Sequence, residues 1–415
     1  MRTVSLLEHE AASVGNPPGE KRFTLAEVEA VGRAQTLIGV EALRWTGRNR
    51  VKATHHVGMV VAPEIRLEVL PKIDGLGLRG TRDALVRMIC TAWDVPIYDG
   101  EITGHASQDH DLLELLIGVF ARRLQAETRR GLSRTYCRRE DDLSRLRGKL
   151  DVTRQFTRLA ASPQKLACRY DEFTADTSLN RLLLCAAQFL RRRSMRADTQ
   201  RLLSEIVAHF ENVETVSAAE ALMGDGRIDR ANRRWDVPAR LARLLLSAIY
   251  QTTHGGRQDG VALLFDMNLL FEAFIAAIVR KALAPLGYEI RTQKPQRCLA
   301  TDRAGRGAFH MKPDLHVERD GWITVLDTKW KHLDPARPNF DIAQSDAYQM
   351  HGYAQVYGAR STILLFPHHH TIAEEPGLQA HWYFESGGSV LGLATVDVAN
   401  TSGFAVMLRG LLEDR

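Results

Sequence analysis

The stretch PDLHVERDGWITVLDTKWK, residues 313–331, holds two alternating apolar runs on either side of the turn sequence RDG. Both runs are typical of β-strands, and Gly321 suits a turn that needs a positive φ. Residues two apart on a strand share a face, so Asp327 and Lys329 are expected on one side of the sheet. Pairing of the two strands can bring Asp314 to the same side. The stretch therefore predicts a β-hairpin on which two carboxylates and one ammonium group converge.

These three residues suit metal-dependent phosphodiester hydrolysis. Two carboxylates held together repel each other unless a positive charge lies between them. Mg²⁺ meets this need, because it is usually held by one or two protein carboxylates plus waters and substrate phosphates, and it acidifies a bound water. A lysine two residues from a ligand can orient that water or neutralise the transition state. Asp314 and Asp327 are therefore candidate metal ligands and Lys329 a candidate catalytic residue. The alternative is a surface hairpin with unrelated charges.

Two flanking helices strengthen the functional interpretation. Glu272 lies beside an apolar stripe, where a glutamate is usually paired or ligating, although a boundary position that reaches water is the competing interpretation. In the helix after the hairpin, Gln349 and Tyr353 are four residues apart and share a face. They could contact substrate phosphate or brace the lysine, or they could simply close the helix onto the sheet. Gln344 and Tyr348 have the same spacing one turn earlier, so either pair could be the functional one.

The chain divides into three predicted parts. Residues 1–105 form a β-rich region, with strand-like alternation within 36–75, and residues 106–255 are mainly helical. Residues 256–415 form a compact α/β domain. The polar, glycine-rich stretch TTHGGRQDG at 252–260 is the best linker candidate. The predicted fold class is therefore α/β, in the form of a multidomain α+β protein.

Four further stretches have distinctive local patterns. A long helix is predicted over residues 263–287, and Thr24 is the predicted N-cap of a shorter helix. Arginines crowd residues 122–193, where solvated helix faces and intrachain ion pairs are slightly favoured over a phosphate-binding surface. The stretch PHHH at 367–370 is interpreted as an exposed loop, because three adjacent histidines do not easily share one metal ion.

The composition is that of an ordinary globular protein, with 45% hydrophobic and 25% charged residues. A net charge of +5 is compatible with nucleic-acid binding without establishing it. The five cysteines are too far apart to predict a zinc site or a disulfide framework. The first residues lack the basic and apolar pattern of a signal peptide, and the sequence has no apolar stretch of about 18–20 residues, so a cytoplasmic protein without a membrane segment is expected. The chain has no Walker A sequence and is not expected to hydrolyse GTP itself.

Several of these motifs, taken in order, resemble a known group of nucleases. Glu272, PD at 313–314, DTK at 327–329 and the Q-x-x-x-Y helix resemble the PD-(D/E)xK nuclease superfamily. More narrowly, the chain resembles the McrC family, the nuclease subunits of the McrBC modification-dependent (type IV) restriction systems. The stretches VGMVVAPEIRLEVLPKI, LRGKLDVTRQF and YDEFTADTSLNRLLL are similar to the family's N-terminal and central regions. The resemblance therefore covers most of the chain.

The resemblance implies a function beyond what the residues alone indicate. The C-terminal domain would have the restriction-endonuclease-like fold and cleave double-stranded, methylcytosine-containing DNA. It would do so only with an McrB-like AAA+ GTPase that forms hexameric rings. The N-terminal part would dock on that ring and stimulate GTP hydrolysis, and the basic residues 44–56 are the segment expected to contact it.

The resemblance also implies roles for single residues. Asp314 and Asp327 would be metal ligands, Glu272 a further ligand, and Lys329 the catalytic lysine. The cofactor would be Mg²⁺, or Mn²⁺ in its place. Two alternatives remain. The first is a stand-alone RecB-like PD-(D/E)xK exonuclease, which the similarities outside the nuclease domain disfavour. The second is a non-catalytic activator or scaffold of the AAA+ ring, which the intact Asp314, Asp327 and Lys329 disfavour.

Overall fold

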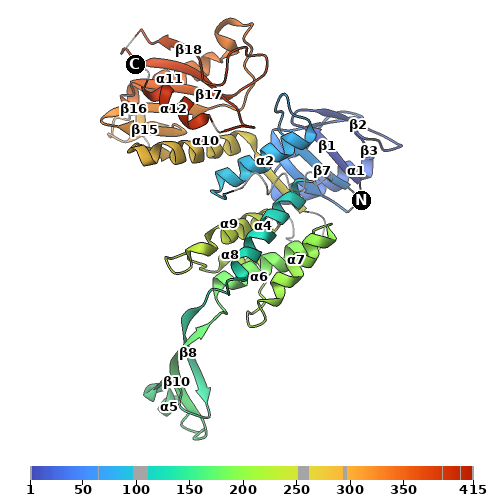
Figure 1. Cartoon of the computed structure of the whole chain (residues 1–415), viewed down its shortest axis with the longest axis vertical. Helices are drawn as coiled ribbons and strands as arrows, with labels where there is room; N and C mark the ends of the chain where they lie inside the picture. The colour runs from blue at the N-terminus through green and yellow to red at the C-terminus, as the bar shows by residue number, and fades with distance from the viewer. Residues whose placement is uncertain are drawn as a thin grey trace. The chain divides into compact units, whose positions relative to one another are not determined.

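The computed structural model describes residues 2–63, 65–96, 111–250, 261–292, 297–385, 387–401 and 403–413. The chain folds into two compact units (Figure 1). One unit joins Met1–Leu113 to Gln251–Arg415, and the other contains Glu114–Tyr250. The two terminal parts, which the sequence suggests as separate domains, thus belong to one compact unit. The linker predicted at 252–260 lies outside the described residues.

The N-terminal part of the first unit contains two four-stranded sheets, in the orders β1-β7-β6-β11 and β3-β2-β5-β4. The β-structure predicted within residues 36–75 is confirmed. Thr24 is the N-cap of the first helix, as predicted, and forms a capping box with Glu27. The strands and helices are β1 (Arg2–Leu7), β2 (Ala11–Val14), β3 (Arg22–Phe23), α1 (Leu25–Ile38), β4 (Leu43–Gly47), β5 (Arg50–Ala53), β6 (His56–Val61), β7 (Ile65–Leu70), α2 (Leu78–Ala92) and β11 (Val261–Asp266).

Strand β11 shows that the long helix predicted over 263–287 is wrong at its start. β11 pairs antiparallel with β6, and helix α10 (Met267–Leu283) begins only after it. Asp266 marks the change, because its side chain accepts hydrogen bonds from the N–H groups of Asn268 (2.8 Å) and Leu269 (3.3 Å). A short apolar run does not distinguish a strand from a helix by periodicity alone. Here the deciding contact is with a sheet in the N-terminal part of the chain.

The C-terminal part of the first unit is built on a mixed six-stranded sheet in the order β12-β15-β16-β17-β19-β18. Strands β16, β17 and β19 run parallel. Helix α11 makes the crossover from β16 to β17, and its residues Met350, Tyr353 and Tyr357 share a buried cluster with Val325 and Leu364 of the sheet. The remaining elements are η2 (Ala284–Leu286), β12 (Glu289–Thr292), β13 (Arg297–Thr301), β14 (Gly307–Met311), β15 (Leu315–Arg319), β16 (Trp322–Thr328), η3 (Pro338–Asp341), α11 (Gln344–Tyr357), β17 (Ser361–Pro367), β18 (Leu378–Tyr383), β19 (Val390–Val396) and α12 (Phe404–Glu413).

The predicted hairpin is confirmed. Strands β15 and β16 pair antiparallel, with Arg319 opposite Trp322. Asp320 and Gly321 form the two-residue loop and have φ values of 52° and 78°. Two consecutive positive φ values are typical of a type I′ turn, for which Asp-Gly is a favoured pair. The turn fixes the register of the hairpin, and with it the positions of the residues at its open end.

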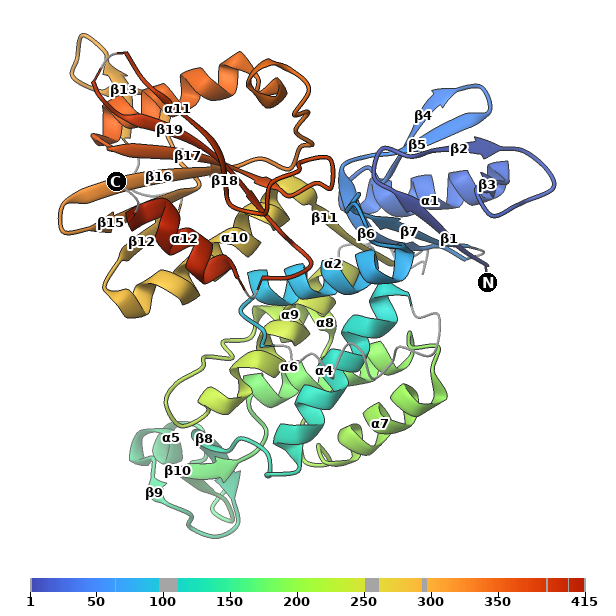
Figure 2. The same ribbon diagram turned by 45° about the horizontal axis from the view of Figure 1, so that its top comes forward.

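The second unit is a group of helices in which α6 packs against α7, α8 and α9. Figure 2 shows these helices beside α4, with a β-ribbon extending from one end of the group. The helices are α4 (Leu112–Thr128), α5 (Val152–Thr157), α6 (Ser178–Arg191), α7 (Ala197–Ala208), α8 (Ala218–Met223), η1 (Arg233–Trp235) and α9 (Asp236–Tyr250). In the described part of the chain, no helix combines the length and apolar character needed to cross a bilayer.

The region is mainly helical, as predicted, but it also contains a β-ribbon that the sequence analysis did not predict. The ribbon consists of β8 (Thr135–Leu143) and β10 (Leu166–Thr174), with the short β9 (Lys149–Leu150) paired to β10. No residue of β8 is buried, and only two residues at the start of β10 are. A strand with both faces near water shows no apolar–polar alternation, so the pattern that normally reveals a strand is missing here.

Many arginines within residues 122–193 form ion pairs, as predicted, but several of these pairs lie on the ribbon rather than on helices. Arg139 lies 3.4 Å from Glu172, and Arg169 lies 2.9 Å from Glu140, each across the β8–β10 pair. These side chains are between one-third and one-half exposed, so each pair contributes little stability. Part of the arginine density of this stretch thus belongs to paired charges on an exposed ribbon.

Gly58 is required by the close pairing of β6 and β11, so Gly58→Ala should lower stability by about 1–3 kcal/mol. A Cβ atom at Gly58 would lie 1.9 Å from the carbonyl oxygen of Leu263, and its φ of 136° also disfavours a side chain. Thermal unfolding followed by circular dichroism measures the loss. Gly32→Ala is the matched control, because a Cβ there meets nothing within 4 Å. Equal stability of the two variants would contradict the close approach.

Candidate functional site

Two aspartates face each other where the β15–β16 hairpin opens. Leu315 pairs with Leu326, and the same register places Asp314 opposite Asp327. The carboxylate of Asp314 accepts two hydrogen bonds through Oδ2, from the N–H and from the hydroxyl of Thr328, both at 2.7 Å. These bonds tie Asp314 to the strand that carries Asp327. The structure thus brings together the two carboxylates that the sequence singles out.

Asp327 has a carboxylate that is almost fully buried. The residue is 2% exposed, and burial together with the charge of Asp314 raises its pKa to about 6. Lys329 Nζ lies 2.7 Å from Asp327 Oδ2, yet this oxygen accepts no well-aligned hydrogen bond. Burial also raises the pKa of Asp314. The surroundings therefore disfavour the charged form of both carboxylates. A further positive charge at the site would favour it.

Lys329 follows directly after β16 and is surrounded by acceptors. Its ammonium group contacts Asp327, lies 3.2 Å from Gln349 Oε1 and is 3.7 Å from Asp346 Oδ1. Burial alone would lower the pKa of Lys329, but Asp327, Asp346 and Asp314 together raise it. The lysine is therefore a fixed positive charge at neutral pH. It is suited to neutralising negative charge and not to accepting a proton.

Helix α11 holds that ammonium group through a chain of directed hydrogen bonds. Gln349 accepts from Lys329 through Oε1 and donates through Nε2 to the hydroxyl of Tyr353, at 2.9 Å. Tyr353 in turn donates to the carbonyl oxygen of Lys312, at 2.8 Å. Burial raises the pKa of Tyr353, so its hydroxyl keeps the proton that this bond needs. The chain links α11 to the segment just before Asp314.

The alternative pair on the same helix lies elsewhere. Gln344 Nε2 donates to the hydroxyl of Tyr348 at 2.6 Å, but Gln344 is exposed and Tyr348 is 66% exposed. Of the two pairs with this spacing, the structure places Gln349 and Tyr353 at Lys329. Geometry thus favours Gln349 and Tyr353 as the pair that can act on Lys329.

Glu272 is not brought into the same cluster. It lies half-buried on α10, and its neighbour Phe271 packs edge-on against Trp330, with ring centroids 5.2 Å apart. Among the described residues, Asp314, Asp327 and Glu272 do not have ligand atoms all within 4.8 Å of one another. The helix is therefore close to the strand that carries the site, but the glutamate itself is not gathered with the two aspartates.

Asp346 is a site residue that the sequence analysis missed. It is 8% exposed on the first turn of α11, and its carboxylate lies 3.3 Å from Lys331 Nζ as well as near Lys329. Its charge is also among the causes of the raised pKa of Asp327. A signal was present, because Asp346 is three residues before Gln349 and so shares a helix face with it.

The residues present fit a hard divalent cation. Asp314 and Asp327 offer carboxylate oxygens, and Asp327 Oδ2 is a buried acceptor without a well-aligned donor. Mg²⁺ and Mn²⁺ favour such oxygen ligands, and two protein carboxylates with waters complete a usual Mg²⁺ site. Asp314 and Asp327 are the residues that would hold it.

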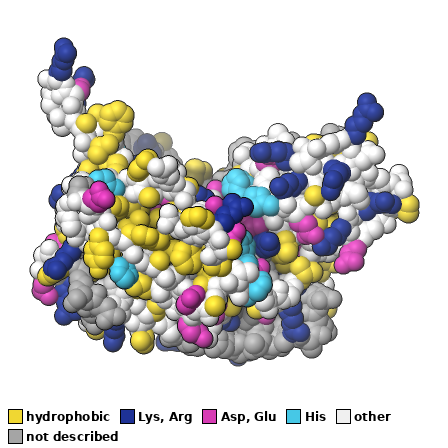
Figure 3. Space-filling view, turned by 90° about the horizontal axis from the view of Figure 1, so that it is seen from above, with side chains coloured by type: hydrophobic (Ala, Val, Ile, Leu, Met, Phe, Trp, Pro, Cys, Tyr) yellow, Lys and Arg dark blue, Asp and Glu magenta, His cyan; other side chains and the backbone are white. Residues whose placement is uncertain are grey.

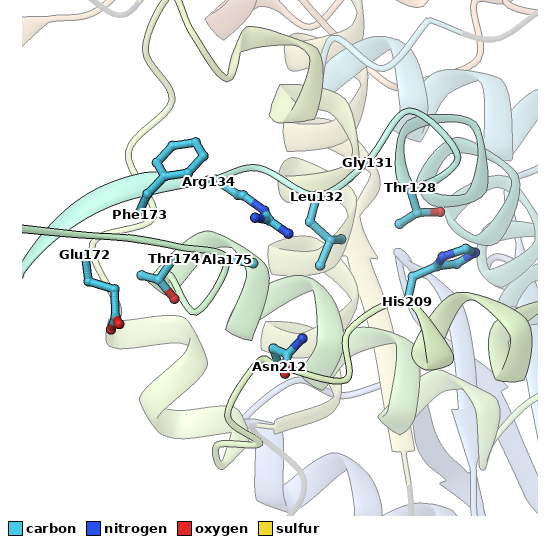
Figure 4. A pocket seen from close by; sticks show the side chains of 10 residues that line it. All are labelled: Thr128, Gly131, Leu132, Arg134, Glu172, Phe173, Thr174, Ala175, His209 and Asn212. Atoms are coloured by element: carbon cyan, nitrogen blue, oxygen red, sulfur yellow. The ribbon is translucent and has the colours of Figure 1, made fainter.

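One other hollow of the described residues has a different character. The pocket at the base of the ribbon in the second unit is lined by Arg134, Glu172, His209 and Asn212 among others, whose side chains are spread over several elements (Figure 4). On the face seen in Figure 3, basic, acidic and apolar side chains are mixed, and histidines gather near the middle. The hairpin site therefore remains the candidate active site.

Comparisons with known proteins agree with this organisation. Residues 51–367 match the family described as "McrBC 5-methylcytosine restriction system component". No curated protein matches the chain.

Two solved structures are similar in fold. The first is a "refined half-complex from tetradecameric assembly of Thermococcus gammatolerans McrB AAA+ hexamers with bound McrC", with a TM-score of 0.70 and 20% identity, covering 99% of this chain and 100% of that chain. The second is a structure of the Thermococcus gammatolerans McrBC complex, with a TM-score of 0.52 and 22% identity, covering 68% of this chain and 88% of that one. At these identities the similarity shows the fold, and it extends over nearly the whole chain.

The raised pKa of Asp327 predicts a distinctive pH dependence of the metal-free protein. Because the folded pKa is about 6 and the unfolded one about 3.9, the native state holds the proton more tightly. Stability from this group is full below about pH 4 and is lost as the pH rises through 6. Asp327→Asn removes this pH-dependent loss of stability, because asparagine does not titrate. The free energy of unfolding of the variant minus that of the wild type should therefore rise by on the order of 2 kcal/mol between pH 4 and pH 7.

Denaturant unfolding in a chelating buffer at a series of pH values measures this difference. Asp320→Asn is the control, because Asp320 is an exposed carboxylate in the turn of the same hairpin. A constant offset between Asp327→Asn and wild type across this range would show that the carboxylate at 327 is not destabilised by its surroundings.

Proposed function

The chain belongs to the family of McrBC 5-methylcytosine restriction system components, and on this basis we propose that it is the DNA-cleaving subunit of such a system. The reaction is metal-dependent hydrolysis of a phosphodiester bond in double-stranded DNA by Asp314, Asp327 and Lys329. The observation that carries the proposal is the buried carboxylate of Asp327. It lies opposite a second carboxylate, and its buried Oδ2 accepts no well-aligned hydrogen bond, although the Lys329 ammonium lies 2.7 Å away.

The residues of the site divide the work of hydrolysis. Mg²⁺, or Mn²⁺ in its place, would be held by Asp314 and Asp327 and would supply an acidified water and charge stabilisation. Lys329 adds a permanent positive charge beside those ligands, where the negative charge of the transition state builds up. The carboxylates around Lys329 keep it protonated, so it acts as a cation and not as a general base.

Gln349 and Tyr353 act as positioning residues. The ammonium of Lys329 has a flexible four-carbon stem, and the Gln349 acceptor limits where it can point. Tyr353 fixes the orientation of the Gln349 amide, because that amide donates to its hydroxyl. A small displacement of a charged group costs a large factor in rate. Glu272, in contrast, would become a further ligand only if binding of the metal or DNA drew it closer to the two aspartates.

The partner in this proposal is an AAA+ GTPase ring. The similar structure from Thermococcus gammatolerans is described as an assembly of McrB AAA+ hexamers with bound McrC. We extend this to the present chain: a hexameric GTPase partner recognises methylcytosine-containing DNA, and this chain stimulates its GTP hydrolysis through the N-terminal part. The family assignment and the fold shared over 99% of the chain support the extension.

Asp314→Ala should abolish DNA cleavage while leaving GTPase stimulation intact. Loss of a metal-binding carboxylate is expected to lower the cleavage rate by about 10²-fold or more, because the charge stabilisation at the phosphodiester is lost. The assay combines the purified chain, its AAA+ partner, GTP, Mg²⁺ and methylated DNA. Asp320→Asn serves as the control and should cleave like the wild type.

The same assay separates the alternative functions. Cleavage by the chain without partner and GTP would favour a stand-alone nuclease. Normal stimulation of GTP hydrolysis without any cleavage by the wild type would favour a non-catalytic activator. Cleavage by Asp314→Ala at the wild-type rate would remove this residue from the active site.

Gln349→Ala should slow cleavage by about 10-fold or more through misplacement of Lys329. Gln344→Ala is the matched control on the same helix and should stay within about twofold of wild type, because its partner Tyr348 is exposed. Gln349→Glu keeps an acceptor oxygen for the ammonium group and should recover part of the rate. Equal rates for the alanine variants at 344 and 349 would contradict the positioning role.

A further inference from the structure

The three consecutive histidines after β17 do not behave as one exposed loop. His368 turns back to the sheet. Its ring Nδ1 lies 2.9 Å from Thr395 Oγ1, and its backbone N–H donates to the carbonyl oxygen of Val396. His369 and His370 instead turn toward Asp74, in the segment that follows β7. The predicted exposed loop is therefore wrong for His369, whose side chain is only 14% exposed. The contact with Asp74, which is remote in the sequence, fixes the positions of His369 and His370.

Asp74 has a largely buried carboxylate with three imidazoles around it, and its side chain is 14% exposed. His369 Nε2 lies against Asp74 Oδ2, His370 Nδ1 is 3.4 Å from the same oxygen and His332 Nδ1 is 3.8 Å from it. The ligand atoms of Asp74, His369 and His370 all lie within 4.8 Å of one another. Asp74 Oδ2 accepts no well-formed hydrogen bond although it is out of contact with water. A buried carboxylate oxygen such as Asp74 Oδ2 is stable only with a positively charged partner.

Protonated histidines alone explain this arrangement poorly. One carboxylate compensates one imidazolium, whereas three imidazoles converge here and two pairs of their rings are close, at 4.3 and 4.6 Å between centroids. Two or more positive rings at that separation would repel each other. The other nearby charges are Lys72 and Glu8, one of each sign. Neutral imidazoles around a carboxylate are, in contrast, an ordinary ligand set for a transition metal.

We propose that Asp74, His369 and His370 form a transition-metal site, with His332 as the nearest fourth ligand. Nitrogen ligands favour Zn²⁺ and its neighbours in the first-row series over Mg²⁺, and Zn²⁺ takes four ligands from histidine, aspartate and water. The ion is therefore a different one from the cation of the Asp314–Asp327 pair. It binds at a place that the nuclease reaction does not use.

A neighbouring hydroxyl supports the required orientation of His369. Its Nδ1 lies 2.7 Å from Thr371 Oγ1. The backbone N–H of Thr371 also donates to this nitrogen, at 3.2 Å, so Thr371 fixes the ring through Nδ1 and leaves Nε2 directed at Asp74. His332 lies beside a hollow lined also by Glu8, Lys72 and Trp330, which gives solvent an entry path.

The site would join segments that are far apart in the sequence. Asp74 follows β7, His332 follows β16, and His369 and His370 follow β17, all within the first compact unit. A bound ion thus stabilises the folded state by linking the N-terminal β-region to the nuclease domain, since it binds the native arrangement and not the unfolded chain. This is a structural role and is independent of DNA cleavage.

A second histidine group serves as an internal comparison. His55, His56 and Asp266 also have ligand atoms within 4.8 Å of one another. There the carboxylate already caps α10, and His56 Nδ1 lies 3.2 Å from the carbonyl oxygen of Glu41. Its groups have partners of their own, so it carries no proposal and supplies the control variant.

The test is zinc binding by the full chain after removal of metal with a chelator. Equilibrium dialysis against Zn²⁺ in excess Mg²⁺ should give one Zn²⁺ per chain, for the wild type and equally for Asp327→Asn. His370→Ala and Asp74→Ala should each bind Zn²⁺ at least about tenfold more weakly. His55→Ala should bind like the wild type. Co²⁺ should give the visible spectrum of a four-coordinate ion in the wild type and lose it in Asp74→Ala.

The outcomes are distinct. His370 is largely exposed, at 69% of its side chain, so its alanine variant folds even if Asp74→Ala does not. Circular dichroism checks this directly. Undiminished Zn²⁺ affinity in His370→Ala and Asp74→Ala, loss of binding in His55→Ala, or no stoichiometric Zn²⁺ binding by the wild type would each overturn the proposal. Unchanged Zn²⁺ binding by Asp327→Asn keeps this result separate from the fate of the proposed nuclease activity.

Discussion

The repulsion between Asp314 and Asp327 is the constraint on which the candidate active site depends. The hairpin register forces the two carboxylates to face each other, and burial denies them the water that would screen their charges. Thr328 satisfies one oxygen of Asp314, and Lys329 brings one positive charge to Asp327. This compensation is incomplete, because the pKa of Asp327 remains raised. A site built in this way favours the arrival of a divalent cation.

The rest of the domain serves to hold this arrangement. A two-residue Asp-Gly turn sets the register, and the parallel crossover from β16 to β17 lays α11 over the sheet beside the site. From that helix Asp346 and Gln349 reach Lys329, and Tyr353 reaches back to the segment before Asp314. The three catalytic candidates are thus supported from two elements. Because of this support, single substitutions on α11 are expected to lower the cleavage rate although they do not alter a metal ligand.

How much of this could be predicted depended on the range of the interactions. The hairpin with Asp314, Asp327 and Lys329 follows from alternation and a turn signal within one short stretch, and Gln349 follows from helical spacing. The β8–β10 ribbon was missed because exposed faces show no alternation, and β11 because its partner β6 is remote in sequence. Asp74 and His369 meet through a tertiary contact that no local pattern encodes. Glu272 illustrates the opposite case, since its motif is present but the structure leaves it outside the cluster.

Anomalous diffraction from crystals grown with Mn²⁺ shows whether Asp314 and Asp327 jointly hold a divalent cation. We expect an anomalous peak about 2.0–2.3 Å from carboxylate oxygens of both residues, absent in crystals of Asp327→Asn. Crystals in which Mn²⁺ is bound elsewhere on the chain, with no peak between these two carboxylates, would contradict it.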